Sequence, residues 1–309
     1  MKKKLTQELI IKHLTLSEED KNEIKSVKVE FRIYLSIQLC SLRSRGKFIQ
    51  YCNDIPAEVI NYLTKQLLLP PTLVVNEPYR KATITEHRQK LLSYLKFDKY
   101  EGLMVTGFES WLESEARQGK LPNELNSDAQ AFLLKNKIVL PGKSVLDRTI
   151  TSVCNKFHSE MFENIYNNLP SDLKEHIDNS LVTTNDSKSY FNRLKQYPPS
   201  ATATSINLYL QLYSKLGSFN LERINSNFIN SKFLEYIFKL AKNYNSRDIK
   251  RFNEHKRYAL MLCFLIESKK YLLDNLIKMH DQFMQEMLRK CRNAYENRFK
   301  QTRKSHRKD

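Results

Sequence analysis

The chain has few residues that interrupt helices, with 6 glycines and 9 prolines among 309 residues. The last glycine is Gly217 and the last proline is Pro199, so no obvious helix breaker follows. Long stretches place apolar residues at steps of three and four, which is helical spacing. We therefore predict an all-α fold of several helices that form helix-turn-helix-like bundles, with a very long C-terminal helix.

Paired cysteines, long apolar runs and a secretory leader are also missing. The five cysteines contain no CxxC pair: Cys40, Cys52, Cys154, Cys263 and Cys291. Three of them, Cys40, Cys263 and Cys291, lie on apolar helical faces, so we expect buried thiols in a reducing compartment. The longest apolar run, Ala259 to Ile266, is too short to cross a bilayer. Polar residues interrupt any apolar core after the MKKKL start. We expect a soluble cytoplasmic protein without a membrane partner.

Catalytic motifs are missing as well: the sequence has no Walker P-loop, GxGxxG, GxSxG or HExxH. His280 and Asp281 are adjacent and would not face each other on a helix. Asp274 and Asp281 would be about 10 Å apart along a helix, whereas a two-metal site holds its ions about 4 Å apart. We expect no catalytic residues, metal, cofactor or small-molecule substrate. An enzyme would instead show Mg²⁺-dependent cleavage that Asp274→Ala or Asp281→Ala abolishes.

Negative charge is scarce, because 51 Lys and Arg outnumber 34 Asp and Glu and give a net charge of +17 with a pI near 9.5. From Lys242 onward there are 18 Lys and Arg but only 8 Asp and Glu, so this stretch carries +10 of the net charge of +17. A surplus of this size is typical of proteins that bind nucleic acid or an anionic membrane surface. An ordinary soluble basic surface is the alternative.

The longest predicted helix occupies the C-terminal stretch, where Ser246 is expected to cap its entry. From Tyr258 to Phe299 it would be about 60 Å long. Its apolar residues recur at steps of three and four, which we interpret as one stripe: Tyr258, Met261, Leu262, Leu265, Ile266, Leu272, Leu273, Leu276, Ile277, Phe283, Met284, Met287, Leu288, Cys291 and Tyr295.

The first hundred residues have a helix, turn, helix pattern. Ser17 and Asp20 resemble a capping box at the start of a helical stretch that ends in the turn from Arg43 to Lys47. A later helix is expected to begin near Thr83, where Thr83 and Glu86 form a second capping box, with basic residues around its first turns. This is the layout of a major-groove reader. An ordinary bundle with a solvated basic face fits the pattern as well.

A second helical block follows, in which Ser144 can cap a long helix. Arg148 would lie in its first turn, where a cation opposes the helix dipole unless an anion accompanies it. That anion is either a phosphate or a nearby carboxylate such as Asp147. We predict one helical DNA-binding unit over residues 1–100, a second over 101–200, and a helical region with the long terminal helix over 201–309.

An ordered set of short motifs makes the chain similar to a known family. The longest motif is Phe252-x4-Arg257-Tyr258-Ala259-x2-Leu262-x-Phe264-Leu265-x7-Leu273-Asp274-x4-Met279-His280-Asp281. Shorter motifs precede it in order: Leu16-Ser-x3-Asp20, Arg32-x5-Gln38-Leu39-Cys-x-Leu42-Arg43-x2-Gly46-x-Phe48, Arg88-x6-Leu95-x-Phe97, Leu140-Pro-Gly142-x-Ser144-x-Leu146-x-Arg148, and Leu194 with Pro198-Pro-Ser200. Together they resemble the N-terminal region of Tn-three family transposases, which act in replicative, cointegrate-forming transposition in bacteria.

The resemblance implies a role for the basic residues. In that family this region binds double-stranded DNA at the terminal inverted repeats, and the catalytic carboxylates lie further along, on an RNase-H-like domain that this sequence does not reach. It also implies a bacterial, nucleoid-associated protein. Lys and Asn replace many of the family's Arg and Ala residues, which should preserve charge but loosen bidentate contacts to guanine. We expect the DNA-binding residues to be Arg43, Arg45, Lys47, Arg80, Lys81, Arg88 and Lys90 in a first set, and Lys143, Arg148, Arg193, Lys195, Lys250, Arg251, Lys256 and Arg257 in a second set.

Two other functions remain open from the sequence. A truncated transposase can act as a regulator that competes for transposon ends or forms mixed complexes, either as a homodimer or with the full-length enzyme. Alternatively, the terminal helix can pair with a partner helix in a protein-interaction module that binds DNA only non-specifically.

Overall fold

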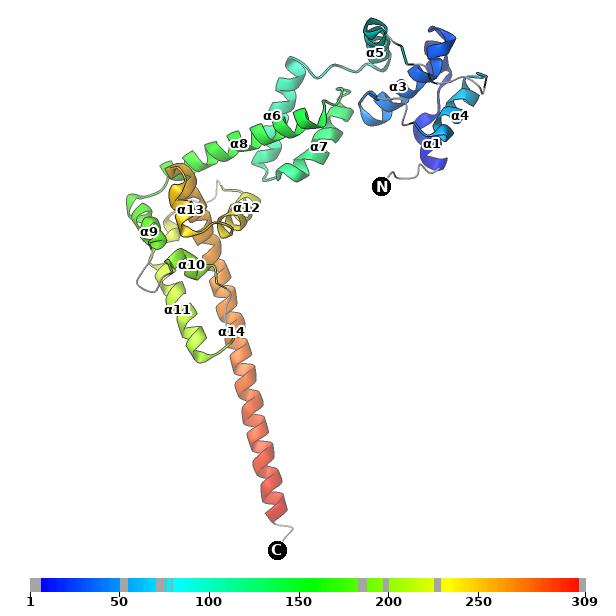
Figure 1. The fold of residues 1–309 in the computed structure, drawn as a ribbon. Helices are drawn as coiled ribbons and strands as arrows, with labels where there is room; N and C mark the ends of the chain where they lie inside the picture. Colours follow the sequence, from blue (N-terminus) through cyan, green and yellow to red (C-terminus); the bar gives the residue numbers. More distant parts are fainter. Residues whose placement is uncertain are drawn as a thin grey trace. The chain divides into compact units, whose positions relative to one another are not determined.

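The computed structural model describes the chain except residues 1–6, 51–54, 71–74, 76, 79, 183–187, 197–199, 225–228 and 306–309. The described residues form α-helices and short 3-10 turns without a strand, and a single parallel bridge joins Asp98 to Ile138. The predicted all-α fold and its long terminal helix are therefore confirmed (Figure 1). None of the described helices is both long enough and apolar enough to cross a bilayer. Cys52, Pro198 and Pro199 lie outside the described residues.

The helices follow one another along the chain. Their bounds are α1 Gln7–Leu14, α2 Glu18–Lys25, η1 Val29–Phe31, α3 Arg32–Arg45, α4 Ala57–Gln66, α5 Lys81–Leu95, α6 Leu103–Arg117, α7 Pro122–Lys135, α8 Lys143–Asn167, α9 Ser171–Leu181, α10 Tyr190–Leu194, α11 Ala203–Gly217, η3 Leu221–Arg223, α12 Ser231–Lys242, α13 Ser246–Arg251 and α14 Glu254–Ser305.

The chain packs as two compact units. Unit 1 comprises residues 1–116 and 121–154, and unit 2 comprises residues 117–120 and 155–309. The predicted division at residues 100 and 200 concerned DNA-binding roles and stays a prediction.

Helix α3 is the centre of unit 1. Its residues from Ile33 to Leu42 are all buried, because α2, α4 and α5 cover it on several sides. Leu63 of α4 and Leu91 of α5 are completely buried against this core. Helix α5 begins at Lys81 with Arg80 as its N-cap, so the predicted start at Thr83 was wrong by two residues and Thr83 lies inside the helix.

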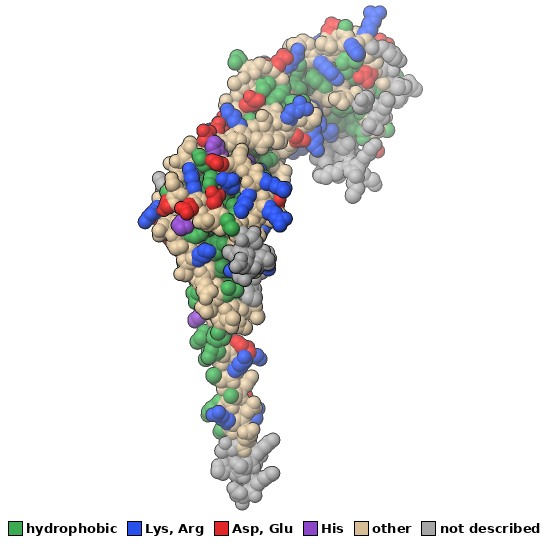
Figure 2. All heavy atoms as spheres, turned by 60° about the vertical axis from the view of Figure 1, so that its left-hand side comes forward, with side chains coloured by type: hydrophobic (Ala, Val, Ile, Leu, Met, Phe, Trp, Pro, Cys, Tyr) green, Lys and Arg blue, Asp and Glu red, His purple; other side chains and the backbone are tan. Residues whose placement is uncertain are grey.

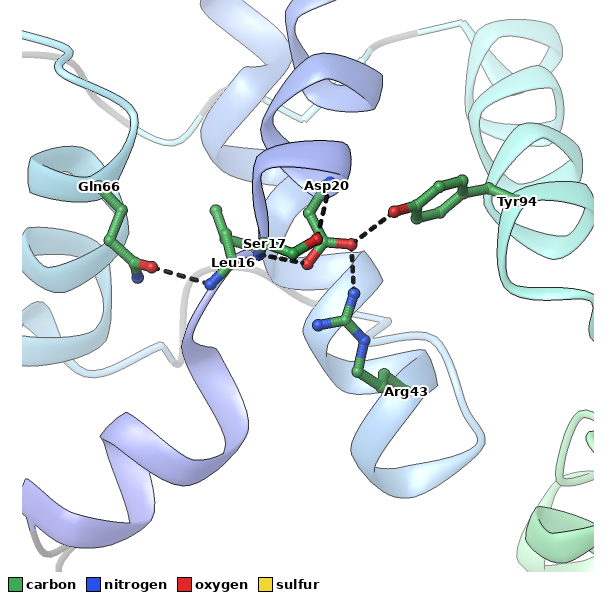
Figure 3. A network of polar contacts seen from close by, with 6 residues as sticks. All are labelled: Leu16, Ser17, Asp20, Arg43, Gln66 and Tyr94. Atoms are coloured by element: carbon green, nitrogen blue, oxygen red, sulfur yellow. Dashed lines mark hydrogen bonds and ion pairs between the residues drawn. The ribbon is translucent and has the colours of Figure 1, made fainter.

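A buried carboxylate ties three helices of unit 1 together (Figure 3). Asp20 is only 1% exposed and completes the predicted capping box with Ser17 at the start of α2. Its carboxylate also accepts hydrogen bonds from Arg43 of α3 and from the Tyr94 hydroxyl of α5, the latter at 2.8 Å. Burial alone would raise the pKa of Asp20, but the bonds from Arg43, the Ser17 backbone and Tyr94 outweigh it and lower that pKa. The network fixes α2, α3 and α5 in one arrangement.

Helix α14 is the centre of unit 2. Its residues Tyr258 to Leu265 are all buried, and α11 and α12 pack along it. The entry to this helix differs from the prediction. Asn245 caps the short helix α13. Helix α14 begins only at Glu254, where the Asn253 side chain accepts a hydrogen bond from the Lys256 backbone N–H at 2.9 Å. Ser246 is therefore the first residue of α13 and does not cap the long helix.

The distal part of α14 extends beyond its neighbours (Figure 1). The helix has 52 residues, which corresponds to about 78 Å. The prediction of one apolar stripe was wrong: Leu272, Leu276 and Met279 are buried, whereas Leu273 and Ile277 are 43% and 55% exposed. Cys291 is also exposed, contrary to the prediction for its thiol, while Cys40, Cys154 and Cys263 are buried.

Candidate nucleic-acid interface

The end of α3 and the start of α8 meet in unit 1, although nearly a hundred residues separate them in the sequence. The backbone N–H of Leu140 donates to the Gly46 carbonyl at 2.7 Å. Gly46 ends α3 with a left-handed φ of 65°, and a Cβ there would lie 2.5 Å from Leu140 Cδ1. Only glycine fits both requirements without a shift of the packing. This contact brings Arg45 and Lys47 of the first predicted set close in the fold to Lys143 of the second.

We call the cations around this contact the junction surface. Its members share one property, which is that none is ion-paired with a described residue. They are Arg45, Lys47, Arg88, Lys99, Lys143 and Arg148. All are exposed except Arg88, which is half-buried. Unneutralised cations gathered on one surface can attract phosphates without first breaking an internal pair.

A small hollow forms part of the junction surface. Its volume is about 230 Å³, and Phe48, Thr85, Arg88, Gln89, Leu92, Lys99, Tyr100 and Val139 line it. The Arg88 guanidinium lies 5.3 Å from the centre of the Phe48 ring. A cation that is half-buried over an aromatic ring gains from the ring but still lacks a counter-charge.

Lys99 and Tyr100 were missed from the sequence. They reach the hollow because the Asp98 backbone N–H donates to Lys137 O at 2.8 Å, and Val139 N–H donates to Asp98 O at 2.9 Å. Such a pairing across 40 residues leaves no local signal, so no sequence pattern could have found them.

The sequence left two candidates for an anion beside Arg148, a phosphate or a carboxylate such as Asp147. Asp147, the expected carboxylate, accepts a hydrogen bond from the Asn126 side chain at 2.6 Å. Among the residues that the structure describes, no carboxylate is ion-paired with Arg148. Arg148 lies in the second turn of α8, one helical turn beyond Lys143.

The other predicted cations of unit 1 either contact a described side chain or lie outside the junction surface. Arg43 is bound to the buried Asp20. Lys90 lies 3.5 Å from Glu23 and also donates to Ser26 Oγ. Arg80 and Lys81 are exposed at the start of α5. The DNA contacts predicted for these four residues stay predictions.

In unit 2 several predicted cations hold helices together. Lys195 of α10 donates to the Tyr244 carbonyl at 2.5 Å and lies 5.0 Å from the Phe191 ring centre, and burial lowers its pKa. Arg257 Nε lies 3.6 Å from Asp178 Oδ1, and Lys256 Nζ lies 4.0 Å from the Phe252 ring centre. These cations have structural contacts within unit 2.

The remaining predicted cations of unit 2 lie in the last turn of α13 or beside a hollow. Lys250 and Arg251 are exposed in the last turn of α13. Arg193 lines a hollow of about 180 Å³ together with Lys215, which lies 4.7 Å from the Tyr190 ring centre. Figure 2 shows Lys and Arg side chains interspersed with Asp and Glu over this unit, so its visible face is not uniformly basic.

Acidic, histidine and cysteine side chains are the groups that could hold a metal ion. Within the described ranges, no three such side chains lie close enough together to hold a metal ion. His280 Nδ1 is 3.5 Å from Asp281 Oδ1 on the exposed part of α14.

Comparisons with known proteins show that this chain is similar to part of several transposases. It is 24% identical to the transposase for transposon Tn1546 of Enterococcus faecium, over 94% of this chain and 30% of that protein. It is 20% identical to the transposase for transposon Tn501 of Pseudomonas aeruginosa, over 97% of this chain and 31% of that protein. The transposase for transposon Tn2501 of Escherichia coli is 22% identical over 88% of this chain and 28% of that protein. All three of these relatives are named transposases.

A family model also matches the first half of the chain. Residues 1–153 match the family described as Domain of unknown function (DUF4158). Together with the relatives, this match fits the N-terminal region of Tn-three family transposases. The chain spans about 30% of the length of the curated relatives that it matches. The relatives support a role in transposition.

Proposed function

We propose that this chain binds double-stranded DNA at the terminal inverted repeats of a transposon, as the end-recognition part of a Tn-three family transposase. The proposed role is recognition, and we assign catalysis to none of its residues. The relatives' names and the net charge of +17 support a DNA partner.

The junction surface is the observation that carries this proposal. It combines Arg45 and Lys47 after α3 with Lys143 and Arg148 at the start of α8, and these cations have no ion-pair partner among the described residues. The start of α8 adds the positive end of a 25-residue helix. Phosphate contacts of this kind set the register of a protein on DNA, while a few arginines read base edges.

The hollow beside Arg88 is the second part of the proposed interface. Arg88 is held over Phe48, so its guanidinium is oriented before DNA arrives. An oriented arginine loses less conformational freedom when it binds a phosphate or a guanine. Lys99 at the same hollow adds a second positive charge.

Unit 2 is proposed to meet another segment of the repeat through Lys250, Arg251 and Arg193. Lys195, Lys256 and Arg257 are proposed to support that surface, because their charged groups already contact Tyr244, Phe252 and Asp178. This division gives the chain two attachment regions on one DNA site.

Fluorescence anisotropy tests the proposal. A labelled duplex of the terminal repeat is titrated with the chain beside a scrambled duplex of equal length, across a series of salt concentrations. We expect tighter binding to the repeat, with a preference that persists at physiological salt. Equal affinities that fall together as salt rises would mean only non-specific attraction to a basic protein, and the proposed end recognition would be wrong.

A further inference from the structure

Helix α14 has two apolar faces, and only one of them is covered. Leu272, Leu276 and Met279 are buried in unit 2, where α14 packs against α11 and α12. A second set of apolar side chains is 42% to 72% exposed: Leu273, Ile277, Met284, Leu288, Tyr295 and Phe299. At about 100° per residue, the second set points about 130° away from the first around the helix axis. It is therefore a separate face and not a frayed continuation of the core.

The exposed face is a straight stripe with a regular period. Leu273, Met284 and Tyr295 are eleven residues apart, and so are Ile277, Leu288 and Phe299. Eleven residues make three turns at about 3.67 residues per turn, close to the value of an ordinary α-helix. The stripe therefore stays on one side of α14 for about 39 Å. Figure 2 shows apolar side chains along one edge of this part of the helix. An exposed stripe of this length needs an explanation.

The charges beside the stripe indicate what covers it. Asp274, Asp281, Arg292 and Arg303 are all exposed and lie on the same edge of the stripe, within about 40° of one another around the axis. The two carboxylates come first in the sequence and the two arginines last. Lys278 and Glu296 lie on the same edge, about 20° further round than Arg303, so each half of the edge carries both signs of charge.

This order of charges matches a second, antiparallel copy of the same helix. In an antiparallel helix pair the same edges of the two helices meet, so Asp281 of each copy faces Arg292 of the other, and Lys278 faces Glu296. In a parallel pair opposite edges meet, and the other edge carries His280, Met287 and Arg298, which offer the arginines no carboxylate. We propose that the chain forms a dimer through the exposed stripe of α14, with the two helices antiparallel.

The apolar residues define the register of the pair. A two-fold axis at the level of Glu286 places Leu273 opposite Phe299, Ile277 opposite Tyr295, and Met284 opposite Leu288 of the second copy. In the same register Asp281 lies within one residue of the level of Arg292 of the second copy. Glu286 itself faces away from the stripe and pairs with Arg289 at 2.8 Å. Two like carboxylates therefore do not meet at the axis.

Charge reversal tests the dimer. The association constant of the 309-residue chain is measured by sedimentation equilibrium. We expect Asp281→Arg alone and Arg292→Asp alone each to weaken association about tenfold, because each change puts like charges at two symmetric contacts. The double variant Asp281→Arg/Arg292→Asp should restore it. The control is Lys290→Asp, which makes the same change of charge about 160° round the helix from Arg292 and should leave association unchanged.

Cross-linking tests the direction of the helices. Cys291 lies on the stripe and is exposed. In the proposed register the two Cys291 residues are about 15 Å apart along the axis, too far for a disulfide, whereas His280 of one copy lies near Cys291 of the other. In a Cys52→Ser background, oxidation should therefore link His280→Cys to Cys291 between copies, and the chain with His280 intact should not cross-link.

Three results would overturn the proposal. A chain that stays monomeric at all accessible concentrations would show that the stripe has another occupant. A double variant that remains monomeric would mean that the charges do not face each other. A disulfide between two Cys291 residues would show parallel helices. None of these results bears on DNA binding, which the anisotropy titration measures separately.

Discussion

The cations of the junction surface and those bound within the two units have the same formal charge but different surroundings. Arg45, Lys47 and Lys143 are exposed and have no ion-pair partner among described residues. Arg43 is bound to the buried Asp20, and Arg257 lies 3.6 Å from Asp178. The comparison teaches that net charge overstates what a chain can offer to DNA. A lysine or arginine already committed to a carboxylate or an aromatic ring has less to gain from a phosphate.

The largest expected effect separates two arginines that lie two residues apart in the sequence. Arg43→Ala would leave the Asp20 carboxylate buried without its cation, and we expect the free energy of unfolding to fall by about 3 kcal/mol. Arg45→Ala removes the same group from an exposed position and should change stability by less than about 0.5 kcal/mol. Urea unfolding measures both. Equal losses would contradict the assignment of structural and free cations.

A substitution at Gly46 tests the contact that assembles the junction surface. Gly46→Ala places a side chain at a φ of 65° and a Cβ 2.5 Å from Leu140 Cδ1. We expect a loss of about 2 kcal/mol in unfolding free energy. Gly142→Ala is the matched control, because a Cβ there meets nothing within 4 Å. A similar loss from both changes would mean that the approach of Leu140 is not the cause.

Neutral substitutions at the junction surface should weaken DNA binding without unfolding the protein. We expect Arg45→Gln together with Lys143→Gln to lower affinity for the repeat about tenfold at moderate salt. Each substitution removes one phosphate-binding cation and should therefore also lower the salt slope by about 0.9. The control is Lys239→Gln, which removes one charge from an exposed i,i+4 pair with Glu235 in unit 2. If the control weakens binding as much per charge removed, the attraction is diffuse and not localised at the junction.

Acid should weaken the Asp20 network selectively. The folded-state pKa of Asp20 is lowered, so its stabilising contribution is complete above its unfolded pKa of about 3.9 and is lost as pH falls through the folded value. We expect the unfolding free energy of the natural chain to decrease more steeply below about pH 4 than that of Asp20→Asn. Urea midpoints at several acidic pH values compare the two slopes. Parallel slopes would mean that Asp20 titrates alike in the folded and unfolded chain.

Local sequence patterns predicted the elements well, because helix formation depends on neighbouring residues. Spacing of three and four predicted the all-α fold and the long terminal helix. The capping box of Ser17 and Asp20 also formed as predicted. The second role of Asp20 was not predictable, since its partners Arg43 and Tyr94 lie 23 and 74 residues away.

Non-local contacts also decided which site residues stay free. Gly46 and Leu140 were both in the family motifs, but nothing in either motif indicates that they touch. The sequence analysis treated the two apolar faces of α14 as one stripe for a similar reason. Adjacent leucines such as Leu272 and Leu273 satisfy one broad stripe in the sequence, and only the positions of α11 and α12 determine which of them is buried.

Lysine modification read by mass spectrometry tests the central claim most directly, because it compares the lysines of the junction surface with exposed lysines elsewhere on the chain in one sample. The chain is acetylated alone and when saturated with the terminal-repeat duplex, and the reactivity of each lysine is measured. The account predicts that DNA protects Lys47, Lys99 and Lys143 strongly, while the exposed Lys135 at the end of α7 and Lys239 of α12 keep their reactivity. Equal protection of all five lysines, or protection of Lys135 and Lys239 alone, would contradict it.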